Sequence, residues 1–121
     1  SRFKNIAMLD PIYDKSVLKW LRLRAKCYIH GHSAGGTNPT LVEAMHFGAP
    51  IIAYDCKYNR ATTDNRIQYF SCSDSLIDSL LKLFENKNCR SMEDLRLFAA
   101  EQFNWKDVVD KYLDVMFLAK K

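Results

Sequence analysis

Residues 27–54 decide the fold of this 121-residue chain, and they read CYIHGHSAGGTNPTLVEAMHFGAPIIAY. Short apolar runs typical of buried strands stand at its two ends: Cys27–Ile29 and Pro50–Tyr54. Between them, Asn38 can cap a helix and Pro39 can open it, because the first helical N–H needs no partner. Gly48 is suited to end that helix. The stretch therefore predicts a strand, a glycine-rich loop, a helix and another strand.

The rest of the chain continues this alternation. We expect two further strands, at Asn5–Leu9 and Ile67–Phe70. Four further helices are predicted: Lys15–Ala25 after Asp14, Asp74–Glu85 after Ser73, Ser91 to about Phe103, and Trp105–Leu118 after Asn104. Asp55–Arg66 predicts a polar loop with one helical turn. Alternating strands and helices indicate the α/β class, here one Rossmann-like three-layer domain over residues 1–121 with a short parallel sheet.

Charge and cysteine content weigh against several classes of protein. The net charge is only +4, and the basic residues that cluster predict a solvated helix face, not a nucleic-acid or lipid surface: Lys19, Arg22, Arg24 and Lys26. The cysteines form no CxxC pair, which predicts reduced thiols: Cys27, Cys56, Cys72 and Cys89. With no signal peptide or membrane-length apolar run visible, we expect a cytoplasmic protein.

One short motif favours a different chemistry. Gly31-x-Ser33-x-Gly35 matches the nucleophile elbow of α/β-hydrolases. In that elbow the helix begins at the nucleophile, so Pro39 would lie inside the helix and break it. The histidine base comes late in that fold, yet the last histidine here is His46, within the predicted helix. A serine hydrolase is therefore the less favoured alternative.

Two histidines raise the question of a metal. His30 and His32 have the spacing of side chains on one side of a strand, and Glu43 or Asp55 could add a ligand. A catalytic zinc usually has three protein ligands, and no clear third ligand is present. We expect structural histidines and no metal.

The glycine-rich loop is better suited to hold a phosphate. Gly35, Gly36 and Thr37 lead into the helix capped by Asn38, where free N–H groups and the helix dipole favour an anion. Glu43 lies one turn further along the helix and could accept hydrogen bonds from sugar hydroxyls. Ligands of parallel sheets bind beyond the carboxyl ends of the strands. Three segments should meet there: Asp10–Tyr13, Gly31–Asn38 and Asp55–Arg60.

The run Asn38–Ala53 resembles the sugar-nucleotide signature of GT-B glycosyltransferases of the group 1 or family 4 type, in which Glu-Ala-Met precedes Gly-x-Pro and an apolar strand. Asp55, Asn59-Arg60 and Phe103-Asn104-Trp105 also stand where such enzymes carry similar residues. The subgroup most similar includes rhamnosyltransferase-like enzymes of bacterial surface polysaccharides. The resemblance implies that this chain is the donor-binding, C-terminal half of such an enzyme. The first strands of this half, an Arg/Lys pair and the acceptor domain would then lie upstream of residue 1.

The resemblance also implies roles for individual residues. Glu43 matches the second Glu of the Glu-x7-Glu motif and would hold the ribose of the donor, while backbone amides near Thr40 and Leu41 would bind the diphosphate. The implied reaction transfers a sugar from a nucleoside diphosphate sugar to an acceptor hydroxyl, with retention of configuration. Because the helix terminus and basic side chains replace a metal in this subclass, no cofactor or cation is expected.

The first Glu of that motif falls at Gly35, a departure that leaves His32 or Ser33 to contact the donor sugar. Expected partners are the sugar donor, a glycan or lipid-linked acceptor, and an N-terminal domain of the same enzyme at the inner membrane face. The chain alone is expected to be inactive and to self-associate. A non-catalytic α/β module that binds a nucleotide or a partner is the alternative.

Overall fold

The chain is built around a short parallel sheet, and the computed structural model describes residues 4–85 and 92–118. β1 (Tyr28–His30) pairs with β2 (Ile51–Tyr54), and β2 pairs with β3 (Gln68–Phe70). The strand order is β1-β2-β3, so β2 is central and β1 and β3 are edges. The predicted α/β class with parallel strands is confirmed.

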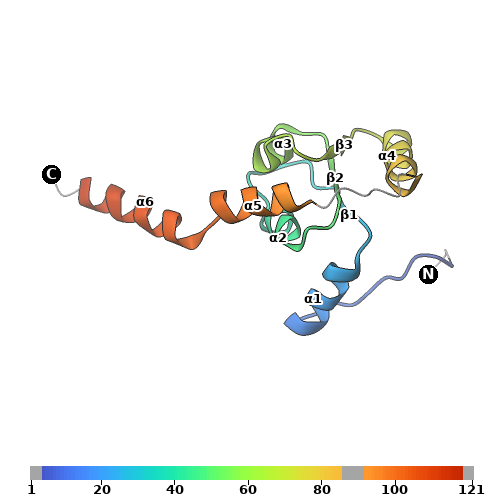
Figure 1. The fold of residues 1–121 in the computed structure, drawn as a ribbon, viewed down its shortest axis with the longest axis horizontal. Coiled ribbons are helices and arrows are strands. Elements are labelled where there is room, and N and C mark those ends of the chain that lie inside the picture. Colours follow the sequence, from blue (N-terminus) through green and yellow to red (C-terminus); the bar gives the residue numbers. More distant parts are fainter. Residues whose placement is uncertain (1–3, 86–91, 119–121) are drawn as a thin grey trace.

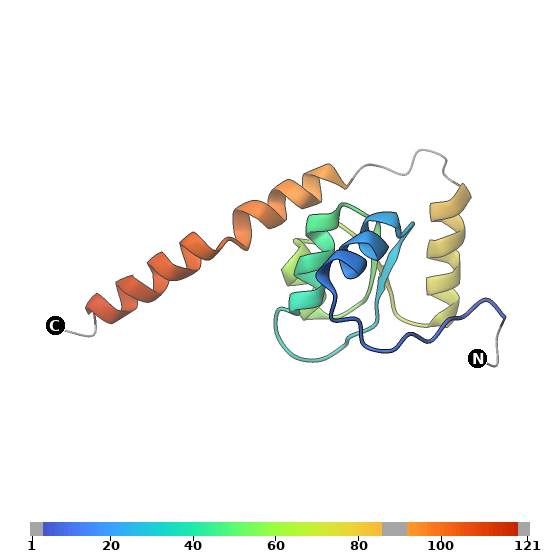
Figure 2. The same cartoon turned by 90° about the horizontal axis from the view of Figure 1, so that it is seen from below.

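Helices lie on both sides of this sheet. They are α1 (Lys15–Arg24), α2 (Pro39–Phe47), α3 (Lys57–Thr63), α4 (Ser73–Glu85), α5 (Glu93–Gln102) and α6 (Trp105–Leu118). Both views place α2 and α3 on one side and α4 on the other, while α1 lies beyond β1 (Figures 1 and 2). α5 packs on α2 and continues into α6, which leaves the body of the molecule. No helix in the described ranges is long and apolar enough to cross a bilayer.

The hydrophobic core forms around α2. Leu41 and Met45 of this helix are fully buried, and burial of one such side chain stabilises the fold by about 1.5–3 kcal/mol. Ile51 of β2 and Leu95 and Ala99 of α5 join them in one cluster. α2 is therefore held between the sheet and α5.

The predicted helix ends are confirmed where the signal is local. Asp14 caps α1 by accepting a hydrogen bond of 2.7 Å from the N–H of Ser16. Asn38 caps α2, and Gly48 ends it at a φ of 69°, in the left-handed region that glycine adopts without strain. The side chain of Asn104 accepts a 2.9 Å hydrogen bond from the N–H of Asp107 at the start of α6.

Three other local predictions were wrong. Asn5–Leu9 forms no strand, because it pairs with no edge of the sheet and its apolar side chains are exposed. Asp55–Arg66 contains the seven-residue helix α3 rather than one turn. Ser73 lies inside α4, where Ser75 instead makes the capping contacts with the N–H groups of Ser71 and Cys72. The predicted cap Ser91 lies outside the described residues.

Contrary to the prediction, the basic face of α1 is not fully solvated. Arg22 forms an ion pair with Glu43 of α2, and its guanidinium lies 5.5 Å from the centre of the Phe47 ring. Arg24 instead lies 4.8 Å above Trp20 of its own helix. Arg22 thus joins α1 to α2, whereas the rest of the basic face is exposed.

α6 buries none of its side chains within the chain. At helical spacing, its apolar residues form a wide exposed stripe: Trp105, Val108, Val109, Tyr112, Leu113, Val115 and Met116. Exposed apolar stripes of this size mark surfaces that associate with partners.

We predict that the chain self-associates through α6 and that Tyr112→Gln with Met116→Gln shifts it toward monomer. These side chains are 70% and 59% exposed, so their replacement removes contacts between chains and little within one chain. Sedimentation velocity over a wide concentration range measures the shift. Lys106→Gln with Asp110→Asn, on the polar side of α6, is the matched control. A parent chain that stays monomeric at every concentration contradicts the prediction.

Candidate functional site

Two loops meet beyond the carboxyl ends of the parallel strands. The loop over residues 31–38 leaves β1 and enters α2, and Asp55-Cys56 leaves β2 and enters α3. The expected meeting of Gly31–Asn38 with Asp55–Arg60 is confirmed by a hydrogen bond from the side chain of Asn59 to the carbonyl of His32. Asp10–Tyr13, the third expected segment, makes no hydrogen bond or ion pair to either loop within the described ranges, and Tyr13 is 89% exposed.

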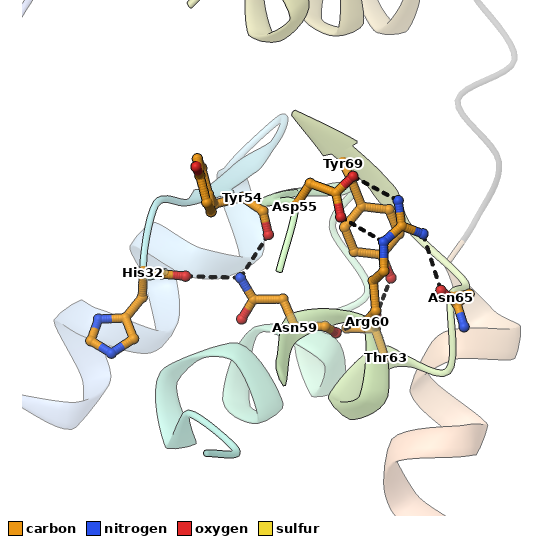
Figure 3. A network of polar contacts seen from close by, with 8 residues as sticks. All are labelled: His32, Tyr54, Asp55, Asn59, Arg60, Thr63, Asn65 and Tyr69. Carbon is orange, nitrogen blue, oxygen red and sulfur yellow. Dashed lines mark hydrogen bonds and ion pairs between the residues drawn. The ribbon is translucent and has the colours of Figure 1, made fainter. Parts of the chain in front are cut away.

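Asn59 joins the two loops. Its Nδ2 donates 2.9 Å hydrogen bonds both to the carbonyl of His32 and to the carbonyl of Tyr54 (Figure 3). Asn59 is only 3% exposed, so these are buried contacts. The carbonyl of Asn59 in turn accepts a 2.8 Å hydrogen bond from the hydroxyl of Thr63. One amide therefore fixes the start of the glycine-rich loop to the end of the central strand.

Arg60, next to Asn59, forms a second polar cluster on the surface (Figure 3). Its guanidinium donates to both carboxylate oxygens of Asp55, at 2.6 and 2.8 Å, and to Asn65 at 3.1 Å. It also lies 4.3 Å from the centre of the Tyr69 ring. The hydrogen bonds from Arg60 lower the pKa of Asp55, and burial raises the pKa of Tyr69. Asp55 is thus held ionised and already has a partner.

The glycine-rich loop offers backbone N–H groups. Residues 31–37 are exposed, and Gly35 has a φ of 94° that disfavours any other residue. Within the described residues, no hydrogen bond engages the N–H groups of Gly35, Gly36 or Thr37. These amides and the N-terminal end of the α2 dipole together favour an anion.

The first turn of α2 is itself already satisfied. Asn38 accepts the N–H of Thr40 on its side chain at 3.0 Å and the N–H of Leu41 on its carbonyl at 3.1 Å. The two amides expected to hold a diphosphate are therefore occupied by the cap. An anion at this end of α2 would meet the loop amides first.

Glu43 lies one turn further along α2, half-exposed and paired with Arg22. An exposed ion pair of this kind stabilises a fold by about 0–1 kcal/mol. Arg22 is the more buried partner, with 23% of its side chain exposed. The carboxylate is therefore held on the side of α2 that faces α1.

Two histidines flank the start of the loop. His30 is 4% exposed, and its ring centre lies 6.1 Å from that of the exposed His32. Burial and the neighbouring His32 lower the pKa of His30. The hydroxyl of Tyr28 lies 3.3 Å from Nδ1 of His30 and donates at 3.4 Å to Thr40. A polar chain thus links β1 to the first turn of α2.

Comparisons with protein-family models, curated proteins and solved structures found no match to this chain. The chemistry of the site itself must therefore indicate a function.

Two other chemistries find little support in this geometry. Ser33 forms no hydrogen bond with a histidine in the described part of the chain, and α2 begins at Pro39 as predicted. Glu43 and Asp55, the possible third metal ligands, are paired with arginines. No group of three or more His, Cys, Asp or Glu residues in the described ranges is arranged to hold a metal.

A hollow of about 360 Å³ lies at the other end of the strands, where α2 ends. Its lining is mainly apolar: Leu23, Ala25, Lys26, Phe47, Gly48, Ala49, Pro50, Leu83 and Phe84. Among the described residues that line it, Lys26 is the only titratable one, so they offer little for catalysis.

Sequence reasoning missed the central role of Asn59 and the contacts of Tyr28. The resemblance had marked Asn59-Arg60 as positions of interest, but polar composition placed them in a loop. An Asn near the start of a short helix gives no signal by itself, because its partners are carbonyls of other elements, 5 and 27 positions away in sequence.

We predict that Asn59→Ala lowers the free energy of unfolding by about 1–3 kcal/mol, because the carbonyls of His32 and Tyr54 lose the buried donor that bridges them. Chemical denaturation measures this change. Lys57→Ala, an exposed change in the same helix, should stay within about 0.5 kcal/mol of the parent. Equal stability of the two variants would contradict the bridging role of Asn59.

Proposed function

We propose that the chain binds a nucleoside diphosphate sugar and forms the donor-binding part of a GT-B glycosyltransferase. The observation that carries this proposal is the row of unengaged loop amides at Gly35, Gly36 and Thr37, which precedes the N-terminus of α2 at the carboxyl end of a parallel sheet. The sequence resemblance over Asn38–Ala53 supports the choice of a sugar nucleotide as the anion.

The proposed chemistry follows from where negative charge develops. When the sugar leaves its donor, charge builds up on the departing diphosphate, and preorganised N–H donors lower the barrier by stabilising it. Gly35 and Gly36 let the phosphates approach the backbone closely. Glu43 would accept hydrogen bonds from the ribose. The glycan or lipid-linked acceptor that supplies the hydroxyl would be bound by a second domain of the complete enzyme, and this enzyme would act in the assembly of a surface polysaccharide.

Saturation-transfer NMR tests binding directly. The probes are UDP, GDP and dTDP, together with UDP-glucose, GDP-mannose and dTDP-rhamnose. The proposal expects transfer to at least one nucleotide and displacement by pyrophosphate. An absence of transfer to every probe overturns it.

Asn38→Asp is a sharper test of the anion position. Asp caps helices as well as Asn does, so stability should hold. Its charge beside the loop amides should weaken nucleoside diphosphate binding by about 1–4 kcal/mol, since two like charges about 4 Å apart repel by about 1 kcal/mol in water and by about 4 kcal/mol near a protein surface. Asn38→Ser, a neutral cap, is the control for calorimetric titration. If Asp and Ser variants bind equally, the diphosphate does not lie at this helix end.

The role of Glu43 is separable from its ion pair. Glu43→Ala should weaken nucleotide binding by about 1–3 kcal/mol through the lost hydrogen bonds to ribose. Arg22→Met also breaks the ion pair but keeps the carboxylate, so it should retain affinity. Isothermal titration and chemical denaturation of both variants separate the two effects. Equal affinities with equally reduced stability would assign Glu43 a purely structural role.

A further inference from the structure

The hydrogen bonds around Tyr28 determine which nitrogen of His30 carries the proton. Thr40 donates its hydroxyl proton to the side-chain oxygen of Asn38 at 2.7 Å. That hydroxyl can then only accept from Tyr28, whose single proton is used in doing so. With the Tyr28 proton directed to Thr40, the Tyr28 oxygen faces Nδ1 of His30 as an acceptor at 3.3 Å, and this arrangement favours the tautomer with the hydrogen on Nδ1.

The other nitrogen of His30 is left as an acceptor. In a neutral imidazole with a proton on Nδ1, Nε2 bears a lone pair. Nε2 of His30 is buried and has no hydrogen-bond partner in the described parts of the chain. Buried polar atoms without a partner are uncommon in native proteins, so each needs an explanation.

The surroundings of His30 point to a ligand of the neighbouring loop. The ring lies at the end of β1 beside that of His32, whose Nε2 lies 3.8 Å from where a Cβ of Gly35 would be. His30 is the last residue of β1 and directly precedes the loop whose amides favour an anion. The ring nitrogens of an imidazole diverge, so Nε2 points away from the Tyr28–Thr40 contact. The exposed His32 and its loop must shift for a ligand to reach it.

We propose that Nε2 of His30 accepts a hydrogen bond from a hydroxyl of the donor sugar, next to the bound diphosphate. This inference rests on the proposed function and adds to it a specificity-determining residue. A lone pair selects a hydroxyl over a phosphate oxygen, because only the hydroxyl can donate. The lowered pKa of His30 is consistent with a neutral ring at pH 7. His32 and Ser33, the residues expected to contact the sugar, are both exposed, and no hydrogen bond within the described residues orients either side chain.

The tautomer is testable without any ligand. Long-range ¹H–¹⁵N NMR of the full 121-residue chain should show Nδ1 of His30 protonated and Nε2 unprotonated. Tyr28→Phe removes the acceptor and should shift this pattern toward the other tautomer, an effect that a purely structural tyrosine would not produce. Protonation of Nε2 in the parent chain overturns the proposal.

His30→Asn tests the contact with the sugar. The Asn amide can replace Nδ1–H as donor to Tyr28 but leaves no acceptor at the position of Nε2. For the nucleotide pair that binds best among UDP/UDP-glucose, GDP/GDP-mannose and dTDP/dTDP-rhamnose, we expect unchanged affinity for the diphosphate and roughly three- to tenfold weaker affinity for the sugar nucleotide, as for the loss of one neutral hydrogen bond.

His46→Asn, at an exposed histidine in the last turn of α2, is the matched control, and it should leave both affinities within about twofold of the parent. If His30→Asn lowers both affinities equally, or neither, the sugar contact is refuted while the proposed function stands. If the parent chain binds none of the six nucleotides, the proposed function fails instead. The ¹H–¹⁵N spectrum of each variant shows whether it folds, and the tautomer measured in the parent tests the assignment without any variant.

Discussion

The packing of α2 between the sheet and α5 is the constraint on which the rest of the structure depends. Leu41 and Met45 are completely buried, and the core cluster forms around them. The same helix presents its N-terminus to the glycine-rich loop and its outer face to Arg22 of α1. A shift of α2 in the core would therefore move the candidate anion site and the α1 contact together.

The sequence predicted those elements whose signals are local. Asn38, Pro39 and Gly48 fix both ends of α2 through backbone geometry that acts within a few residues. Asn5–Leu9 shows the opposite case, because an apolar run becomes a strand only beside another strand. α3 was missed because Thr62 and Thr63 are buried polar residues, and each donates its hydroxyl to a carbonyl four residues earlier. Composition alone could not distinguish such a helix from a loop.

The candidate site was likewise predicted only where its sequence signals are local. The loop and the capped helix were placed from spacing, since a parallel sheet brings such segments to one end. The contacts that hold the loop and the helix in place were not predicted, because these contacts join residues far apart in sequence. Asn59 reaches His32 across 27 positions, and Tyr28 reaches Thr40 across 12. Burial of His30 likewise depends on neighbours that no local pattern specifies.

The backbone conformation at position 35 favours glycine, and this constraint bears on which residue could contact the donor sugar. Its φ of 94° lies where a side chain strains the backbone, so a glutamate could not occupy this position without changing the loop. The open conformation exposes loop amides to a phosphate but removes the side-chain acceptor that the resembled family carries there. Under the proposed function, an acceptor for the sugar would then come from a residue other than residue 35. His30 is such a residue, since β1 fixes its backbone and Tyr28 orients its ring. Under the proposed function, the loop amides would donate to the phosphates and Nε2 of His30 would accept from a hydroxyl of the sugar, so the loop geometry and the histidine tautomer would serve one ligand together.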